Sequence, residues 1–215
     1  MPSENSTPWT AVEPDIDTIT QRYENPIGSL AQAECPAFVL RQAYNPDHCR
    51  GLVRRFIDMG LMRDRAEPRS ADDGRRYGPA IFRIHYEGQR YKPHIDHVVL
   101  REGRTDYSVY RFEHQFAGVL CLQNADASGP GAQGMLHQCI WTPEIQPYIE
   151  EDTFTEYADQ RGLGRCQVSL EPGDLYFFNT RLIHEVPAIA GDQARVVLAV
   201  FIGYSPDDDE VLVWS

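Results

Sequence analysis

The segment that restricts the fold of this chain most strongly is residues 91–97, with the sequence YKPHIDH. Residues 91–100 have the features of a β-strand, with β-branched side chains, a proline near the start and an apolar run at the end. Because side chains alternate along a strand, His94 and Asp96 would point to one face and His97 to the other. An imidazole and a carboxylate that converge in this way can hold one divalent metal ion, but they do not complete a metal site. The fold must therefore bring a third ligand from a distant part of the chain.

His184 is the best candidate for that third ligand. Two histidines and one carboxylate on one side of a metal leave several coordination positions open, which suits non-haem Fe(II) that also binds a cosubstrate and O2. A further charged residue, Arg195, follows eleven residues after His184, at the start of the strand-like segment 195–204. Taken singly, these residues have plainer interpretations, as a surface pair, a core histidine and a solvated edge arginine. Their joint order favours the metal site.

The order His-x-Asp, distant His and following Arg resembles the pattern of the Fe(II)/2-oxoglutarate-dependent oxygenase superfamily. The flanking sequence looks most like the prolyl-hydroxylase-type branch, in the segments 86–96, 171–179 and 184–187. The resemblance extends over residues 35–204, most of the chain. It implies a mainly β fold with flanking helices, a double-stranded β-helix of the jelly-roll or cupin-like type. It also implies a 2-oxoglutarate-dependent non-haem iron dioxygenase.

The resemblance further implies a role for each of the four residues. His94, Asp96 and His184 would be the catalytic metal ligands and would hold Fe(II). Arg195 would bind the far carboxylate of 2-oxoglutarate, because its planar guanidinium suits a carboxylate. O2 would take the remaining metal position, and the cosubstrate would leave as succinate and CO2. Family halogenases lack the metal carboxylate, so the presence of Asp96 predicts oxidation, with hydroxylation as the usual outcome, and argues against halogenation.

The sequence leaves one contact to the cosubstrate open. Many members of the superfamily carry Ser or Thr two residues after the arginine, where this chain has Val197. Tyr86 and Tyr91 are the candidates for a second contact to the far carboxylate, and either could equally be a packed core residue. Desaturation or ring closure would use the same residues as hydroxylation, so the sequence does not separate these outcomes.

Charge guides the expectation about the substrate. The formal net charge of −12 argues against a nucleic-acid partner, which would require a basic face. We therefore expect a small-molecule substrate such as an amino acid or a biosynthetic metabolite, with a peptidyl (prolyl-type) residue as the alternative. If the substrate carries a carboxylate, Arg83, Arg104 or Arg111 could bind it, although each could also be a surface arginine. Residues 101–115, with parts of 63–79, are expected to form a lid, with ordinary surface connections as the alternative.

Two other classes of protein use similar residues. A zinc hydrolase could hold its metal with the same two histidines and aspartate, but it would not require Arg195, and no general-base Glu lies beside the metal strand. A cupin-like binding or structural protein would have no reason to keep all three ligands and the arginine. Iron binding together with turnover of the cosubstrate separates the three classes.

Length and composition predict one globular domain in this chain of 215 residues. We expect a partly mobile N-terminal extension at 1–34 and a single oxygenase domain at 35–215. No apolar run reaches the length of about 18 residues that a membrane-spanning helix needs, and residues 1–10 lack the pattern of a secretory signal. The five cysteines show no C-x-x-C spacing and are expected to be reduced, as in a cytoplasmic protein. The sequence makes no prediction of oligomeric state.

Hydrophobic patterning predicts at least eight short strands with helices outside them. A helix is expected over 45–60 with Asn45 as its N-cap, and a second, broken helical stretch over 142–162. Alternation in one strand would place Arg83 and His85 on the same face. Besides the metal strand, the strand of His184 and the segment 195–204, strands are expected at 35–40, 81–86, 116–123, 134–141, 166–170 and 175–178.

Overall fold

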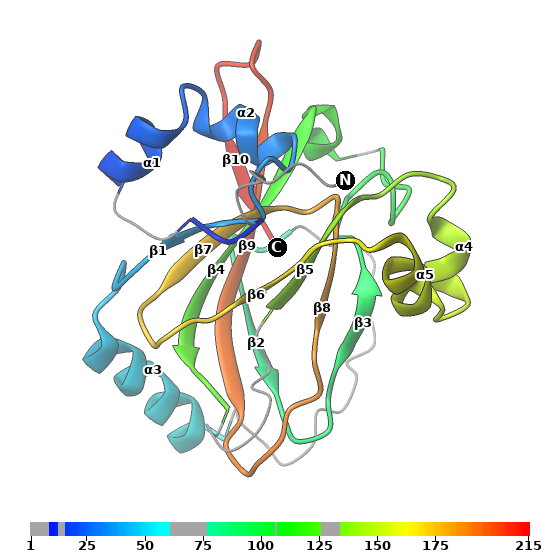
Figure 1. Cartoon of the computed structure of the whole chain (residues 1–215). Helices are drawn as coiled ribbons and strands as arrows, with labels where there is room; N and C mark the ends of the chain where they lie inside the picture. The colour runs from blue at the N-terminus through cyan, green and yellow to red at the C-terminus, as the bar shows by residue number, and fades with distance from the viewer. Residues whose placement is uncertain (1–8, 13–15, 61–76, 106, 126–133) are drawn as a thin grey trace.

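The computed structural model describes residues 9–12, 16–60, 77–105, 107–125 and 134–215. These residues form two antiparallel β-sheets that face each other, with helices on the outside (Figure 1). This architecture is the double-stranded β-helix, or jelly-roll, that the sequence predicts. No helix in the described part of the chain combines the length and apolar character needed to cross a bilayer.

The two sheets differ in size. Among the described residues, the larger sheet has six strands in the order β1-β7-β4-β9-β10, and β2 also pairs with β9. Its strands are β1 (Phe38–Leu40), β2 (Ile81–His85), β4 (His114–Gln123), β7 (Leu175–Asn179), β9 (Arg195–Tyr204) and β10 (Leu212–Trp214). The smaller sheet, within the same described residues, has the order β3-β8-β5-β6. Its strands are β3 (Tyr91–His94), β5 (Gly134–Ile140), β6 (Arg165–Val168) and β8 (Leu182–Val186).

The main hydrophobic core lies between the inner faces of the two sheets. The larger sheet contributes Val119, Tyr176 and Val197 to this core, and the smaller sheet contributes Leu136 and Val168. All five residues are buried, and burial of apolar surface of this kind is the main favourable term in folding. The packed core fixes the distance between the sheets, and therefore the relative positions of polar side chains that share the inner faces.

Helix α3 (Pro46–Asp58) covers the outside of the larger sheet, as the sequence predicts (Figure 1). The Asn45 side chain accepts hydrogen bonds from the backbone N–H groups of Asp47 and His48, at 2.8 Å and 3.3 Å. A capping side chain and a proline in the first turn are the standard start of a helix. The predicted start of this helix is therefore confirmed.

Strand β2 has an apolar outer face and a polar inner face. Phe82 packs on Phe56 of α3 with ring centroids 4.6 Å apart, and Ile84 belongs to the same outer cluster. Arg83 and His85 alternate with these residues and line a cavity inside the barrel. The predicted alternation is confirmed, and the structure adds that the polar face is the inner one.

The described N-terminal residues pack onto the larger sheet. The backbone of Val12 bonds to Ala37 and Val39, with N···O distances of 2.9 Å and 3.0 Å. Helices α1 (Ile16–Arg22) and α2 (Pro26–Ala31) follow (Figure 1). Residues 1–8 and 13–15, which belong to the expected N-terminal extension, lie outside the described residues.

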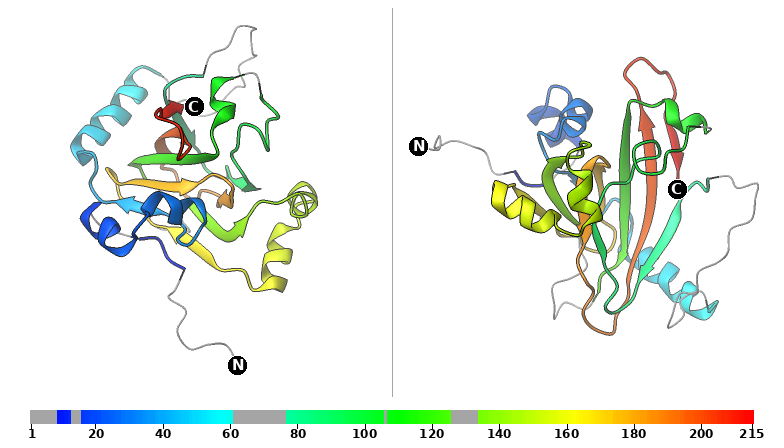
Figure 2. Two further views of the ribbon diagram at one scale, coloured as in Figure 1. Left: turned by 90° about the horizontal axis from the view of Figure 1, so that it is seen from above. Right: turned by 90° about the vertical axis from the view of Figure 1, so that its right-hand side faces the viewer.

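Helices α4 (Gln146–Glu150) and α5 (Phe154–Arg161) form the broken helical stretch that the sequence predicts, and they lie beside the smaller sheet (Figure 2). Phe154 and Ala158 of α5 pack against Ile95 and Ile183 in one buried cluster. Ile95 and Ile183 are direct neighbours of the predicted metal ligands. The helices therefore support the backbone that carries these ligands.

Strand β3 is shorter than the predicted strand 91–100, because it ends at His94. The chain then leaves the sheet and turns, and the His97 imidazole accepts hydrogen bonds from the backbone of Val99 and Leu100 at 3.2 Å and 3.3 Å. This local hydrogen bonding competes with strand pairing, as polar side chains do at turns. The prediction of a continuous strand was therefore wrong beyond His94.

The segment 101–115 contains a short 3-10 helix, η1 (Ser108–Arg111), and the first two residues of β4. Its role as a lid stays a prediction. Most of 63–79, the other part of the predicted lid, lies outside the described residues.

Candidate metal centre

His94 and His184 lie directly opposite each other on the paired strands β3 and β8. Their ring centroids are 4.3 Å apart, with an angle of 50° between the ring planes. Side chains that oppose each other across antiparallel strands project from the same face of the sheet. Strand pairing thus brings together two imidazoles that are ninety residues apart in the sequence.

Hydrogen bonds to the backbone orient both imidazoles. Nδ1 of His94 lies 2.6 Å from the carbonyl oxygen of Lys92, and Nδ1 of His184 lies 2.8 Å from that of Leu182. A carbonyl oxygen can only accept, so Nδ1 carries the proton in each ring and Nε2 presents its lone pair. Histidines that bind metals through one nitrogen usually donate from the other in this way.

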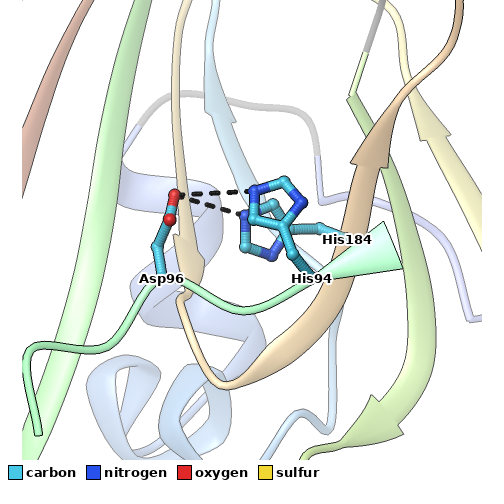
Figure 3. Close-up of side chains that lie close together, drawn as sticks. All are labelled: His94, Asp96 and His184. Atoms are coloured by element: carbon cyan, nitrogen blue, oxygen red, sulfur yellow. Dashed lines mark ion pairs between the residues drawn. The ribbon is translucent and has the colours of Figure 1, made fainter. Parts of the chain in front are cut away.

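Asp96 completes the cluster from a position just beyond the end of β3 (Figure 3). Its Oδ2 lies 3.5 Å from Nε2 of His184 and 3.9 Å from Nε2 of His94. Candidate ligand atoms of the three residues all lie within 4.8 Å of one another. Two imidazole nitrogens and one carboxylate oxygen in this arrangement fit a divalent ion such as Fe(II). The structure therefore brings together the three residues that the sequence proposes as ligands, although Asp96 is not on a strand with His94.

A buried hydrogen-bond network positions Asp96. The Asp96 N–H donates to the carbonyl oxygen of Thr180 at 3.1 Å, and the Asp96 carbonyl accepts from Nε2 of Gln115 at 2.9 Å. Oε1 of Gln115 accepts from the backbone N–H of Val98 at 3.0 Å. The amide of Gln115 thus ties the loop after β3 to β4. Sequence reasoning missed Gln115, because its partners are backbone groups that only the folded chain brings near it.

Arg101 binds the other oxygen of the Asp96 carboxylate. Its Nη1 donates to Oδ1 of Asp96 and also to the carbonyl oxygen of Ile95, the latter at 3.1 Å. Oδ1 therefore faces Arg101, whereas Oδ2 faces the two histidines. This division leaves one carboxylate oxygen directed at the position that a metal would occupy.

Burial and neighbouring charges set the protonation states of the cluster. Burial, with a contribution from nearby His184, lowers the pKa of His94 to about 3. Burial by itself would raise the pKa of Asp96, but its interactions with His184, His94 and nearby Arg83 outweigh burial and hold this pKa below the ordinary range. At neutral pH, His94 is therefore a neutral imidazole and Asp96 is a carboxylate, which are the forms that bind metal.

Arg195 lies opposite His85 on the paired strands β9 and β2. It is 5% exposed, and its Nη1 donates to Nδ1 of His85 at 3.0 Å. Burial, and then the charges of Arg195 and Arg83, lower the pKa of His85 to about 4, so the imidazole is neutral at physiological pH. Because Nδ1 accepts, Nε2 carries the proton, and this buried atom has no hydrogen-bond partner among the described residues.

The three-residue cluster, Arg195 and His85 line one cavity between the sheets, with about 490 Å³ of space including its open mouth. Of the two tyrosines proposed as cosubstrate contacts, Tyr91 lines this cavity, whereas Tyr86 is not among the lining residues. Tyr86 follows the last residue of β2, and alternation after the inward-facing His85 would direct it to the outer side, with Phe82 and Ile84.

Tyr176 is a cavity residue that sequence reasoning missed. It lies on β7, is 4% exposed, and stacks on Phe178 with ring centroids 5.4 Å apart. Burial raises the pKa of its phenol, so the hydroxyl keeps its proton. The alternation of β7 places Tyr176 and Phe178 on one face, a signal that was present in the sequence, although nothing there says that this face is the inner one.

The three arginines proposed as substrate contacts have different surroundings. Arg83 lines the cavity. Arg111 forms ion pairs with Asp208 and Glu210 at 2.8 Å and 2.6 Å. Arg104 bonds to the Tyr77 hydroxyl at 2.9 Å and pairs with Glu102 at 3.0 Å. Arg104 and Arg111 are not cavity-lining residues, so their proposed role as substrate contacts is not supported by their positions.

Comparison with known proteins gives one match at the level of sequence. Residues 52–215 match the family model described as the carrier-protein-independent halogenase WelO5. This range contains all three cluster residues and Arg195, and covers every described strand except β1. A comparison with curated proteins found no match.

Solved structures share the fold at low sequence identity. An N-substituted L-amino acid dioxygenase from Burkholderia ambifaria AMMD aligns with a TM-score of 0.56 and 15% identity, over 88% of this chain and 90% of that chain. HygX from Streptomyces hygroscopicus, with nickel and 2-oxoglutarate bound, aligns with a TM-score of 0.51 and 12% identity, over 80% of this chain and 83% of that chain. At such identities the likeness shows a common fold.

Proposed function

Because the chain belongs to the family of the carrier-protein-independent halogenase WelO5, within the Fe(II)/2-oxoglutarate-dependent oxygenase superfamily, we propose that it oxidises a small molecule, with hydroxylation as the expected outcome. It is a non-haem iron enzyme that uses Fe(II), 2-oxoglutarate and O2. The observation that carries the proposal is the cluster of His94, Asp96 and His184, in which both Nε2 atoms face one carboxylate oxygen. The prolyl-hydroxylase-type branch stays a prediction, since the matching family is that of WelO5.

His94, Asp96 and His184 hold Fe(II) in this proposal. When bound, Fe(II) with 2-oxoglutarate and O2 supplies an oxidant that can attack an unactivated C–H bond, while the cosubstrate is converted to succinate and CO2. The chain contributes two imidazoles in the tautomer that leaves Nε2 available. It also contributes one carboxylate, which Gln115 and Arg101 hold in place.

In this proposal Arg195 binds the far carboxylate of 2-oxoglutarate. Within the described residues, no carboxylate lies within ion-pair distance of Arg195, so its buried charge is available for a ligand. His85 holds the guanidinium in place, because its Nδ1 accepts a hydrogen bond from Nη1 of Arg195. Tyr91 and Tyr176 line the same cavity and are candidates for a second contact to the carboxylate.

The apolar part of the cavity wall limits the access of water. Val119, Phe178 and Val197 line the cavity together with the polar residues. Removing water from such a site strengthens the interactions of buried charges and suppresses side reactions. The inner faces of the two sheets thus provide both the charged groups and their low-dielectric surroundings.

Asp96 favours oxygenation over halogenation, even though the family takes its description from a halogenase. The halogenases of the superfamily lack the metal carboxylate. Here Asp96 is present and its Oδ2 lies within 4 Å of Nε2 in both histidines. An aspartate at this position occupies the place that a halide would need, so we propose transfer of oxygen.

The substrate in this proposal is a free amino acid or a biosynthetic metabolite, with a peptidyl residue as the alternative. We also propose that residues 35–215 form the catalytic domain, and that the enzyme works in the cytoplasm. Bringing substrate and cosubstrate to one metal in one cavity is the central requirement of such a reaction.

A screen of amino acids and small metabolites tests the proposed function. The protein is loaded with Fe(II) and supplied with 2-oxoglutarate and O2, with and without bromide, and succinate release and product mass are measured. We expect one compound to stimulate succinate release and to gain one oxygen atom in both conditions. A brominated product would show halogenation instead. Metal-dependent hydrolysis with zinc, or binding of iron without any cosubstrate turnover, would place the protein in one of the other two classes.

A further inference from the structure

Arg83 occupies a position inside the barrel. It lies on β2 opposite Val197 of β9, on the same inner face as His85. Its guanidinium carbon is 6.0 Å from the ring centroid of Phe201, which also lines the cavity. A permanently charged group therefore forms part of the wall that also carries the candidate metal ligands.

In the part of the chain that the structure describes, Arg83 forms no ion pair, and the carboxylate of Asp96, on which its charge also acts, faces Arg101 and the histidines. By contrast, Arg101 pairs with Asp96, and Arg111 pairs with two acidic residues at the surface. Placing a charge in a partly buried cavity without a partner is unfavourable, and such charges usually have a ligand or an ion pair. A ligand of opposite charge would remove this cost.

The proposed metal and cosubstrate do not neutralise Arg83. The two positive charges of Fe(II) and the one of Arg195 are matched by the carboxylate of Asp96 and the two carboxylates of 2-oxoglutarate. The positive charge of Arg83 then remains. Arg101 adds further positive charge at the outer side of Asp96, so counting it increases the excess. The cavity therefore lacks at least one negative charge when metal and cosubstrate are bound.

We propose that the substrate is an anion, and that Arg83 binds its negatively charged group, a carboxylate being the simplest case. A guanidinium presents parallel N–H donors that match the two oxygens of a carboxylate. Arg83 and the three-residue cluster line one cavity, so a small carboxylate held by Arg83 has its carbon chain inside the same cavity as the metal. This inference rests on the proposed function, because the charge count includes Fe(II) and 2-oxoglutarate.

The test compares carboxylates with their own primary amides. The protein is loaded with Ni(II) and 2-oxoglutarate, which gives a complex that does not turn over, and binding is followed by calorimetry. The probes are amino acids, N-acyl amino acids and simple aryl and alkyl carboxylates, each paired with the amide of the same acid. Arg83→Gln removes the charge, and Arg54→Gln, an exposed arginine on α3, serves as the matched control.

In the wild type and in Arg54→Gln, we expect at least one carboxylate to bind about tenfold or more tightly than its amide. Arg83→Gln should abolish this difference, while its affinities for Ni(II) and 2-oxoglutarate change by less than about twofold. If no carboxylate is preferred in the wild type, or if the preference survives in Arg83→Gln, the proposal is overturned.

Two further results separate this inference from the proposed function. A loss of 2-oxoglutarate affinity in Arg83→Gln would assign Arg83 to the cosubstrate and overturn the substrate role. Failure of the wild type to bind both Ni(II) and 2-oxoglutarate would overturn the proposed function itself, and with it the charge count. Normal binding of both without any preference for carboxylates would overturn only the inference about the substrate.

Discussion

The guanidinium of Arg195 donates a hydrogen bond to Nδ1 of His85, its direct cross-strand partner, at 3.0 Å. This contact holds the arginine against the wall of the cavity. It also selects the tautomer of His85 that carries its proton on Nε2, a buried donor with no partner in the described part of the chain. The buried guanidinium is thus held in one orientation by the neighbouring strand, an arrangement that suits a carboxylate ligand.

Replacing Arg195 by alanine should weaken the binding of 2-oxoglutarate and leave metal binding intact. Losing one partner of a buried, charge-assisted pair costs on the order of 2–5 kcal/mol, because the other charge is left without compensation. The dissociation constant of 2-oxoglutarate for the Ni(II)-loaded protein, measured by calorimetry, should therefore rise steeply. Arg54→Ala is the control. An unchanged constant for 2-oxoglutarate would show that another residue binds the far carboxylate.

His85 should make the stability of the fold depend on pH. Its pKa falls from 6.5 to about 4 in the folded protein, mainly through burial, so the unfolded chain binds more protons between these values. The contribution of His85 to the free energy of unfolding is therefore present above pH 6.5 and is lost as the pH falls toward 4. The loss should reach at most about 3 kcal/mol.

Urea unfolding of the apo protein at several pH values measures this effect. His85→Gln should show a shallower decline in the free energy of unfolding between pH 6.5 and 4 than the wild type. His48→Gln, which alters an exposed histidine on α3, should keep the slope of the wild type. Equal slopes in the wild type and His85→Gln would mean that His85 is not held neutral by the fold.

Gln115 should act on the metal through Asp96. Gln115→Ala removes the amide that bonds to the backbone of Asp96 and Val98, and each buried group left without a partner costs about 1–3 kcal/mol. Loss of a residue that orients a ligand typically weakens metal binding by about 10–100-fold. Ni(II) titration should show this loss of affinity. The control variant is Gln138→Ala, which alters an exposed residue of β5 and should bind Ni(II) as tightly as the wild type. Wild-type affinity for Ni(II) in a folded Gln115→Ala protein would show that Gln115 does not support metal binding.

The sequence predicted correctly those features that depend on the identity and order of particular residues. The order of His94, Asp96, His184 and Arg195 predicted the cluster, and the family resemblance that this order carries, together with the strand pattern, predicted the fold. The N-cap of α3 could be read from Asn45 and Pro46 for a similar reason, since a cap depends on local sequence.

The remaining features depend on strand register, on which face of a strand lies inward, and on a local turn. The pairing of His85 with Arg195 follows from the register of β2 and β9, which the pattern of either strand alone does not determine. Tyr86 was a candidate by its position near the metal strand, but alternation along β2 separates it from the inward-facing Arg83 and His85. The end of β3 at His94 depends on the turn that His97 stabilises, and this turn outweighed the apolar pattern of 98–100.

The most direct test of the central claim is an anaerobic titration of Fe(II) and 2-oxoglutarate, followed by the visible charge-transfer absorption that develops when the two bind together. We expect one Fe(II) per chain in the wild type. His94→Ala and His184→Ala should be folded by circular dichroism but should not develop the band, because each lacks one imidazole ligand. A band of wild-type intensity in both variants would contradict the assignment of His94, Asp96 and His184 as the metal centre.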